Sequence, residues 1–171
     1  MPFTPFHLGP SFLIGMLFLS QLNMAAILLS SIIIDIEPIY CIISHSCPIH
    51  GVLHTYVGVT ALSLTGVTAV IYVTKKQFQR ISDALGIKQT YSLRSIAIGA
   101  LIGGWIHVFL DSFLYPELLP FWPVLLTNPF VGIIDNDTIY LTTIIGFVGG
   151  ALLYFWKLKT ALKAKSDRAN I

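Results

Sequence analysis

The sequence predicts an all-α integral membrane protein: a helical bundle with an N-terminal re-entrant helical hairpin and three full transmembrane spans. Composition is the first observation, because 55% of the 171 residues are apolar, 11% are charged and the mean hydropathy is +0.79. Soluble domains are not so apolar. Charge placement is the second, because all ten Lys and Arg residues fall within 75–94 and 157–168. We therefore expect a single membrane-embedded domain over residues 1–171.

The N-terminal stretch fits two arrangements. A single helix over 11–34 would place His7 and Asp35 on opposite sides of the membrane. A re-entrant helical hairpin over 1–37, turning near 21–23, would return both residues to one side, and it must then pack against protein. We favour the hairpin because a metal ion shared by the two residues would stabilise it. The stretch lacks a basic n-region and a cleavage site, so we expect it to remain in the mature chain.

Three later runs are apolar and long enough to be transmembrane helices, at 51–74, 92–115 and 138–157. At 1.5 Å per residue, a helix over the first run reaches about 35 Å, which spans the hydrocarbon. Residues 75–91 carry apolar side chains at helical spacing opposite charged ones, which predicts a short interfacial helix that stops at Gly86.

Positive charge beside membrane spans marks the cytoplasmic side. The basic segment 75–94 and the basic tail from Lys157 onward are therefore both expected to be cytoplasmic, which three crossings satisfy. This predicts a multi-pass protein of the cell membrane with a cytoplasmic C-terminus and membrane lipid around it. The net charge of +2 is small and segregated, so no nucleic-acid partner is expected.

The segment 115–137 contains four prolines and several aromatic residues, which exclude one long helix and suit an extracytoplasmic loop at the membrane interface. It could roof a cleft that admits lipid head groups, or it could be a rigid connector with aromatic anchors. Asp137 is expected to cap the last helix.

Cys41 and Cys47 lie beside His45 in a predicted short loop, and they are the only cysteines. They fit either a small disulfide loop or two buried thiols. His45 itself is expected to contact solvent.

His107 and Asp111 form the strongest local motif, because an i, i+4 spacing sets an imidazole and a carboxylate side by side on an apolar helix. The same step continues through small and polar residues, so this face should point into the bundle. The pair could bind a metal ion or could be a structural hydrogen bond.

His50 and His54 repeat this spacing and resemble half of a zinc site, although His50 could be only a solvated helix start. Asp35 and Glu37 precede Pro38, which should make the backbone extended and aim both carboxylates to one side. They could bridge metals or orient an attacking water, or could simply meet the aqueous edge of the bilayer.

The topology places these groups on one side of the membrane and predicts a site for a divalent metal, with zinc expected from the mixture of imidazole and carboxylate donors. The candidate ligands are His7, Asp35, His50, His54, His107 and Asp111.

The chain resembles the YdjM-like membrane-bound metal-dependent hydrolases, also described as LexA-binding inner-membrane hydrolases, and more distantly zinc-dependent phospholipase C. The likeness rests on His7-Leu-Gly, Asp35-Ile-Glu37-Pro38, His50-Gly-Val-Leu-His54-Thr55 and His107-Val-Phe-Leu-Asp111-Ser112. The resemblance implies that five of the candidates are ligands: His7, Asp35, His54, His107 and Asp111. The chain departs from the family pattern after Asp35, where many members have Asp and His instead of Glu37 and Pro38.

Together these observations predict a metal-dependent hydrolase acting on a lipid or other head-group phosphoester at the extracytoplasmic face. Glu37 is the expected general base, and Asp35 is expected to bridge or complete the metal site. The alternatives are an ion- or proton-coupled transporter and a non-catalytic scaffold stapled by its metal. Two G-x-x-x-G patterns, at 99–103 and 146–150, allow helix pairing within the chain or in a homo-oligomer.

Overall fold

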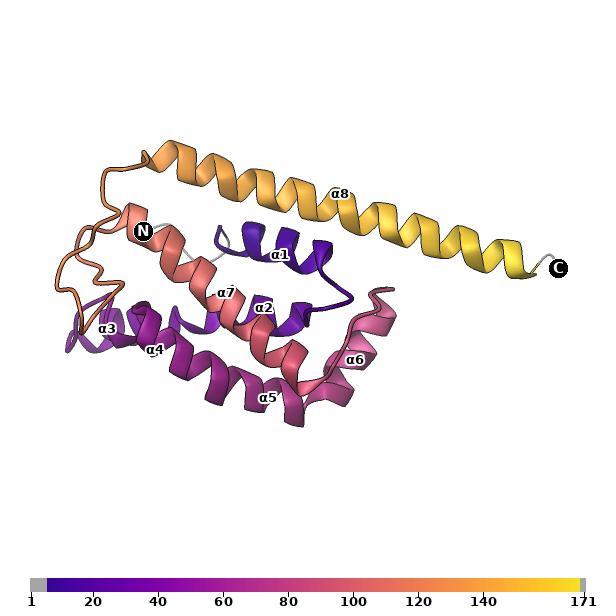
Figure 1. The fold of residues 1–171 in the computed structure, drawn as a ribbon, viewed down its shortest axis with the longest axis horizontal. Coiled ribbons are helices and arrows are strands. Elements are labelled where there is room, and N and C mark those ends of the chain that lie inside the picture. The colour runs from indigo at the N-terminus through magenta and orange to yellow at the C-terminus, as the bar shows by residue number, and fades with distance from the viewer. Residues whose placement is uncertain (1–5, 170–171) are drawn as a thin grey trace.

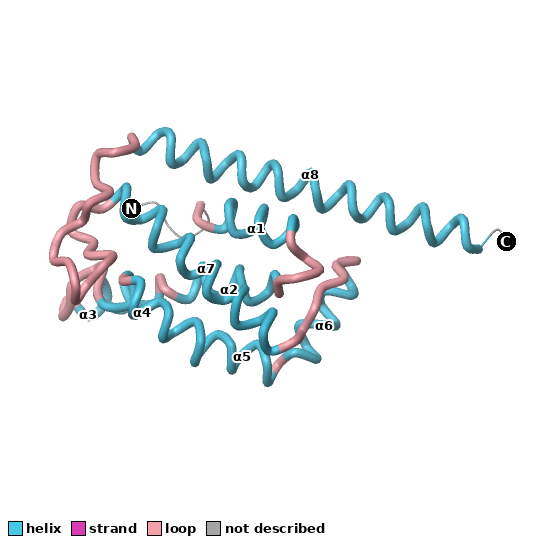
Figure 2. Tube along the Cα trace, viewed as in Figure 1, coloured by secondary structure: helices cyan, strands magenta, loops and turns pink. Residues whose placement is uncertain are grey.

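The computed structural model describes residues 6–169, apart from the side chains of 164, 165, 168 and 169. All regular elements in this part of the chain are helical (Figure 2). Within the described residues, four helices are long and apolar enough to cross a membrane: Met24–Ser44, Tyr56–Val73, Leu93–Leu114 and Asn136–Lys163. They support a membrane-inserted protein. The sequence predicted three such spans, and the additional one is Met24–Ser44.

The N-terminal part of the chain folds back on itself. Helix α1 (Leu8–Leu17) and helix α2 (Met24–Ile33) lie side by side, with α1 between α2 and α8 (Figure 1). Ser11 Oγ donates a buried hydrogen bond to Ser31 Oγ at 3.1 Å, which ties the pair together. At the turn, the Asn23 side chain accepts a hydrogen bond from the Ala26 amide, as an N-cap does. This geometry returns the chain toward the end where it began.

The chain does not become extended before Pro38, so that prediction was wrong. Asp35 has helical backbone angles, and α3 (Ile36–Ser44) begins directly after it. Pro38 occupies the first turn of α3, where the missing N–H would have had no intrahelical acceptor. Helices α2 and α3 therefore follow one another with only a short irregular step at Ile34 and Asp35. Together they form the segment Met24–Ser44, which is long enough to span a membrane.

The span predicted at 51–74 is broken into shorter pieces. A 3-10 turn, η1 (Val52–His54), precedes α4 (Tyr56–Ala61), whose N-cap Thr55 accepts a hydrogen bond from Gly58. A π-helical turn, η2 (Leu62–Val67), then joins α4 to α5 (Thr68–Val73). Within the π-turn, the Ser63 hydroxyl lies 2.8 Å from the Ser30 hydroxyl of α2. His54 thus lies just before the regular helix rather than within it.

Helix α6 (Lys75–Ala84) ends where predicted, because Gly86 adopts a left-handed φ of 68°. Helix α7 (Leu93–Leu114) follows, with Ser92 as its N-cap. The predicted interior face of α7 is confirmed, since Ser95, Gly99, Gly103, His107 and Asp111 are all buried.

Both G-x-x-x-G patterns pack against neighbouring helices of the same chain. A methyl group added at Gly103 would collide with the backbone of Ile27 in α2, and one added at Gly99 would lie 2.8 Å from the carbonyl oxygen of Asn23. A methyl group at Gly146 would similarly meet the backbone of Gly9 in α1. These close approaches assign the two patterns to packing within the chain.

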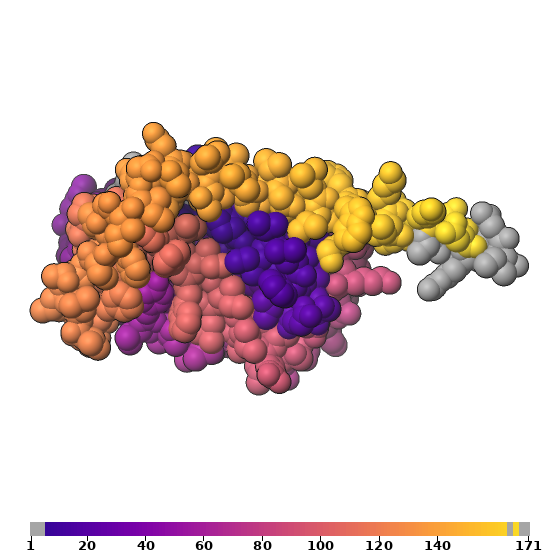
Figure 3. Space-filling model, turned by 45° about the horizontal axis from the view of Figure 1, so that its top comes forward, coloured from indigo at the N-terminus to yellow at the C-terminus, as the bar shows by residue number. Residues whose placement is uncertain are grey.

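Helix α8 (Asn136–Ala169) runs along the outside of the bundle beside α1 and extends past the other helices (Figures 1 and 3). Asp135 caps it, because its carboxylate accepts hydrogen bonds from the Thr138 amide and hydroxyl. The expected cap, Asp137, lies inside the first turn instead. Residues 115–135 have no regular helix, in agreement with their four prolines.

Candidate metal centre

Five predicted ligands converge from four separate segments of the chain. His7 lies just before α1, Asp35 lies between α2 and α3, His54 ends the 3-10 turn, and His107 and Asp111 lie one turn apart on α7. Four of these residues are at most 2% exposed: His7, His54, His107 and Asp111. Burying so many ionisable groups is costly, and it requires compensating partners.

Asp111 lies at the centre of this cluster. Its Oδ1 atom is 2.8 Å from His7 Nε2, and its Oδ2 atom is 3.1 Å from His107 Nε2. The same Oδ2 is 3.8 Å from His54 Nε2. Asp35 makes a second bridge, since its Oδ1 lies 3.5 Å from His107 Nε2 and 3.9 Å from His54 Nε2. Two carboxylates therefore lie among three imidazoles.

The rings of His107 and His54 are oriented by their outer nitrogens. His107 Nδ1 is 2.8 Å from the Ser31 carbonyl oxygen, which can only accept, so Nδ1 carries the proton. His54 Nδ1 lies 2.9 Å from Glu37 Oε2. In both residues Nε2 is buried and faces carboxylate oxygens of Asp35 and Asp111, which lie between 3.1 and 3.9 Å away. A nitrogen held in this way is suited to ligate a metal ion.

The donor atoms form two groups of three. One group is His7, Asp35 and His107, and the other is His50, His54 and Asp111; in each group the donor atoms lie within 4.8 Å of one another. Imidazole nitrogens and carboxylate oxygens are the ligands of zinc and of similar divalent metals. The residues present therefore fit one metal ion or two neighbouring ions.

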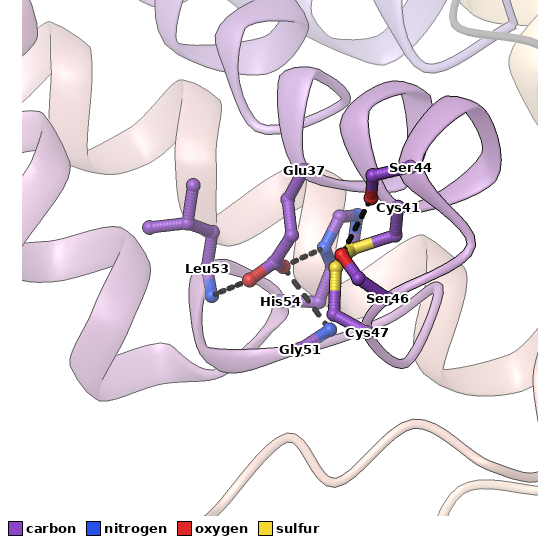
Figure 4. Close-up of a disulfide and its surroundings, with 8 residues drawn as sticks. All are labelled: Glu37, Cys41, Ser44, Ser46, Cys47, Gly51, Leu53 and His54. Atoms are coloured by element: carbon purple, nitrogen blue, oxygen red, sulfur yellow. Dashed lines mark hydrogen bonds and ion pairs between the residues drawn. A yellow bond between two sulfur atoms is a disulfide. The ribbon is translucent and has the colours of Figure 1, made fainter.

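Glu37 takes a position that the sequence did not indicate. Its two oxygens accept hydrogen bonds from the Gly51 and Leu53 amides, each at 3.1 Å, while Oε2 also meets His54 Nδ1 (Figure 4). A methyl group at Gly51 would lie 2.6 Å from Glu37 Oε1, so a larger residue there would displace this carboxylate. Glu37 thus holds the turn that presents His54.

A disulfide supports the same turn. Cys41, near the end of α3, is bonded to Cys47, which decides between the two alternatives left open by the sequence (Figure 4). Because Glu37 lies one helical turn before Cys41, both contacts tie α3 to the segment leading to His54. His45 lies in this small loop, is exposed and has a left-handed φ of 50°. It stands apart from the cluster, as expected.

His50 lies at the outer edge of the cluster and has partners that sequence reasoning missed. Its Nδ1 is 3.0 Å from Oε1 of the exposed Glu117, and its ring lies against that of Tyr115, with ring centroids 4.2 Å apart. Glu117 has no motif around it, so its role depends on how the loop folds. Burial, together with the nearby charge of His54, lowers the pKa of His50.

The carboxylates have the opposite effect on His54. Burial alone would lower its pKa, but hydrogen bonding to Asp35 and Glu37 and the charge of Asp111 raise the pKa to about 9. An imidazolium at this position compensates the buried negative charge when no metal is bound. A metal ion would supply the same compensation and displace the proton.

No family model, no curated protein and no solved structure matches this chain. The chemistry of the cluster must therefore be argued from its own residues.

Proposed function

We propose that this protein is a metal-dependent membrane hydrolase. One observation carries the proposal: buried imidazoles from three segments and two carboxylates meet at one point, with the Nε2 atoms of His54 and His107 both aimed at oxygens of Asp35 and Asp111. A single structural hydrogen-bonded pair needs only one imidazole and one carboxylate, so the burial of three imidazoles with two carboxylates favours a metal centre.

His7, Asp35 and His107 would hold one divalent ion, and His50, His54 and Asp111 a neighbouring one. Asp35 and Asp111 each approach histidines of both groups, so they are the residues suited to bridging. Zinc is the expected metal, and when bound it supplies a Lewis acid that polarises a phosphoryl oxygen and lowers the pKa of water.

The hydrogen bonds of Glu37 favour a positioning role over its predicted role as general base. Its oxygens already accept from two amides and face His54, so it has little capacity to take a proton from water. Asp35 has a side chain that is 16% exposed, against 3% for Asp111. We therefore assign to Asp35 the acceptance of a proton from the attacking water, and to Glu37 the orientation of His54.

The proposed substrate is a phosphoester of a lipid or other head group. The cluster lies at one end of an apolar bundle, beside the aromatic loop 115–135, whose composition suits the head-group level of a membrane. We place this end on the extracytoplasmic side and the C-terminus in the cytoplasm. The segregation of Lys and Arg supports this orientation, and so does the disulfide, which persists in oxidising compartments.

The test is elemental analysis of detergent-purified protein together with hydrolysis of bis(p-nitrophenyl) phosphate and of a fluorescent phospholipid. Wild type should contain one or two zinc ions per chain and release product. His107→Ala should lose metal and turnover together. His45→Asn is the matched control, because it removes an exposed histidine outside the cluster and tolerates the left-handed backbone.

Two outcomes would reject parts of this proposal. Wild-type protein without stoichiometric metal, even after incubation with zinc, would exclude a metal centre. Metal that is bound and lost as expected, but with no turnover of either ester, would favour the metal-stapled scaffold. Metal-dependent ion flux in vesicles would favour the transporter, whose polar path would have to continue from the cluster past the hydroxyl pair Ser30 and Ser63.

A further inference from the structure

A cavity of about 270 Å³ lies at the other end of the bundle from the histidine cluster. It forms where the end of α1, the connection between α6 and α7, and the C-terminal half of α8 come together (Figure 1). No function proposed above uses it. Its size is at the lower limit of ligand pockets, which suits a head group rather than a whole lipid.

The wall of this cavity has two chemically different parts. Met16, Leu19, Ile87 and Leu158 supply apolar surface. The polar part consists of Lys88 and Lys157, whose side chains carry ammonium groups, and of Ser20 and Tyr154, whose side chains carry hydroxyl groups. None of the described residues that line the cavity is acidic, so Lys88 and Lys157 make the lining positively charged. A ligand that matches both parts carries an anionic group next to an apolar one.

The apolar part of the cavity is built by buried residues of the fold. Met16, Leu19 and Ile87 are buried in one hydrophobic cluster, so the apolar wall is fixed. The Tyr154 hydroxyl donates a hydrogen bond to the Leu85 carbonyl at 2.9 Å, which joins α8 to the connection after α6. Gly86, with its left-handed φ, lets this connection pass Leu158 closely.

The surrounding surface is that of a membrane interface. Phe155 and Trp156 are 64% and 62% exposed and lie next to Tyr154 on α8. Aromatic residues of this kind favour the head-group level of a bilayer, and basic pockets between membrane helices are suited to anionic head groups. The cavity is therefore positioned to receive a lipid from the adjoining leaflet.

We propose that this cavity binds an anionic phospholipid, with the phosphate between Lys88 and Lys157 and the adjoining glycerol and first acyl carbons against Met16, Leu19 and Leu158. The site is separate from the histidine cluster, so it stands or falls independently of the hydrolase proposal. Its occupant holds α1, α8 and the connection after α6 together at the end of the bundle where the structure has no cross-link.

The experiment uses full-length protein in mixed micelles with equal amounts of phosphatidylglycerol and phosphatidylcholine, and native mass spectrometry counts the lipids that each chain retains. Wild type should retain one phosphatidylglycerol in preference to phosphatidylcholine. The double variant K88Q/K157Q should lose this preference by roughly 25-fold, because each lysine near anionic lipid contributes about fivefold. The matched control K159Q/K163Q removes two other lysines of α8 that do not line the cavity.

The conservative double variant K88R/K157R keeps both positive charges and should retain the lipid, and a helical circular dichroism spectrum equal to that of wild type shows that K88Q/K157Q is folded. Equal losses in K88Q/K157Q and K159Q/K163Q would overturn the proposal, because they would indicate general surface attraction. Equal retention of the two lipids by wild type would also overturn it. Displacement of the lipid by millimolar glycerol 3-phosphate would indicate a soluble phosphoester as the ligand and would overturn the assignment to a membrane lipid.

Discussion

The two ends of this bundle treat charge in opposite ways. At one end, His7, His54, His107 and Asp111 are buried and fixed by short contacts to one another, to Glu37 and to a backbone carbonyl. At the other end, Lys88 is exposed and Lys157 is only partly buried, so neither charge is enclosed by the fold. A buried charge is costly unless a specific partner compensates it, whereas an exposed charge is stabilised by water and needs no specific partner. This difference favours the buried end as the place for the proposed metal chemistry.

Removing one buried carboxylate should have the largest effect. Asp111→Asn leaves His7 and His107 without their shared partner and should lower zinc affinity by more than about 100-fold, the upper range for loss of an outer partner. Competition with a chelator of known affinity measures this change. Asp83→Asn, an exposed carboxylate on α6 at the other end, should leave the affinity unchanged. Similar losses in both variants would contradict the contrast between the two ends.

Separating the helices behind the cluster should come next. Gly103 lies one helical turn before His107 on α7. Gly103→Ala places a methyl group against the backbone of Ile27 and should lower the free energy of unfolding by about 3 kcal/mol. Thermal or denaturant unfolding in detergent checks the stability. Gly66→Ala is the control, because its methyl group would meet only a flexible Leu62 side chain. A stable Gly103→Ala protein with normal zinc binding would show that close packing of α2 and α7 is not required.

Weakening the support of one ligand should have a smaller effect. Glu37→Gln brings an amide NH₂ group toward backbone N–H donors and disturbs the orientation of His54, so zinc affinity should fall by about 10- to 100-fold. Glu117→Gln should change it by only a few fold, because Glu117 is 58% exposed. Calorimetric titration compares the two. A Glu37→Gln protein that binds zinc normally but no longer hydrolyses ester would restore the general-base role.

The smallest effect is expected at the basic end. Tyr154→Phe removes one hydrogen bond to the Leu85 carbonyl and should lower the free energy of unfolding by about 1 kcal/mol or less. Its zinc content should equal that of wild type. Loss of metal in this variant would mean that the two ends are coupled, which the separation described above does not predict.

Much of the architecture was predictable because it follows from local chemistry. The interior face of α7 follows from a helical repeat of small and polar residues, and the end of α6 follows from Gly86. The proximity of the six candidate ligands was also predictable, because the positions of Lys and Arg assign the segments that carry these ligands to the same end of the bundle. Their role in binding metal and in catalysis is still a prediction.

Other features depend on contacts that local patterns do not contain. Pro38 was expected to extend the chain, but the same residue is tolerated in the first turn of a helix, and only tertiary packing decides between the two. Asp135 and Asp137 are equally good caps by type, and the loop determines which one meets Thr138. Glu117 comes near His50 through loop geometry alone.

The π-turn at Leu62–Val67 has a consequence for how this span tolerates length changes. Such a turn carries one more residue than an α-helix would, so it offsets α4 from α5 by about 100° around the axis. Deleting a single residue there would let the span relax into a continuous α-helix while rotating its outer half relative to its inner half. An insertion or deletion in this short window would therefore rotate α4, and with it the segment that carries His54, about the helix axis relative to α5.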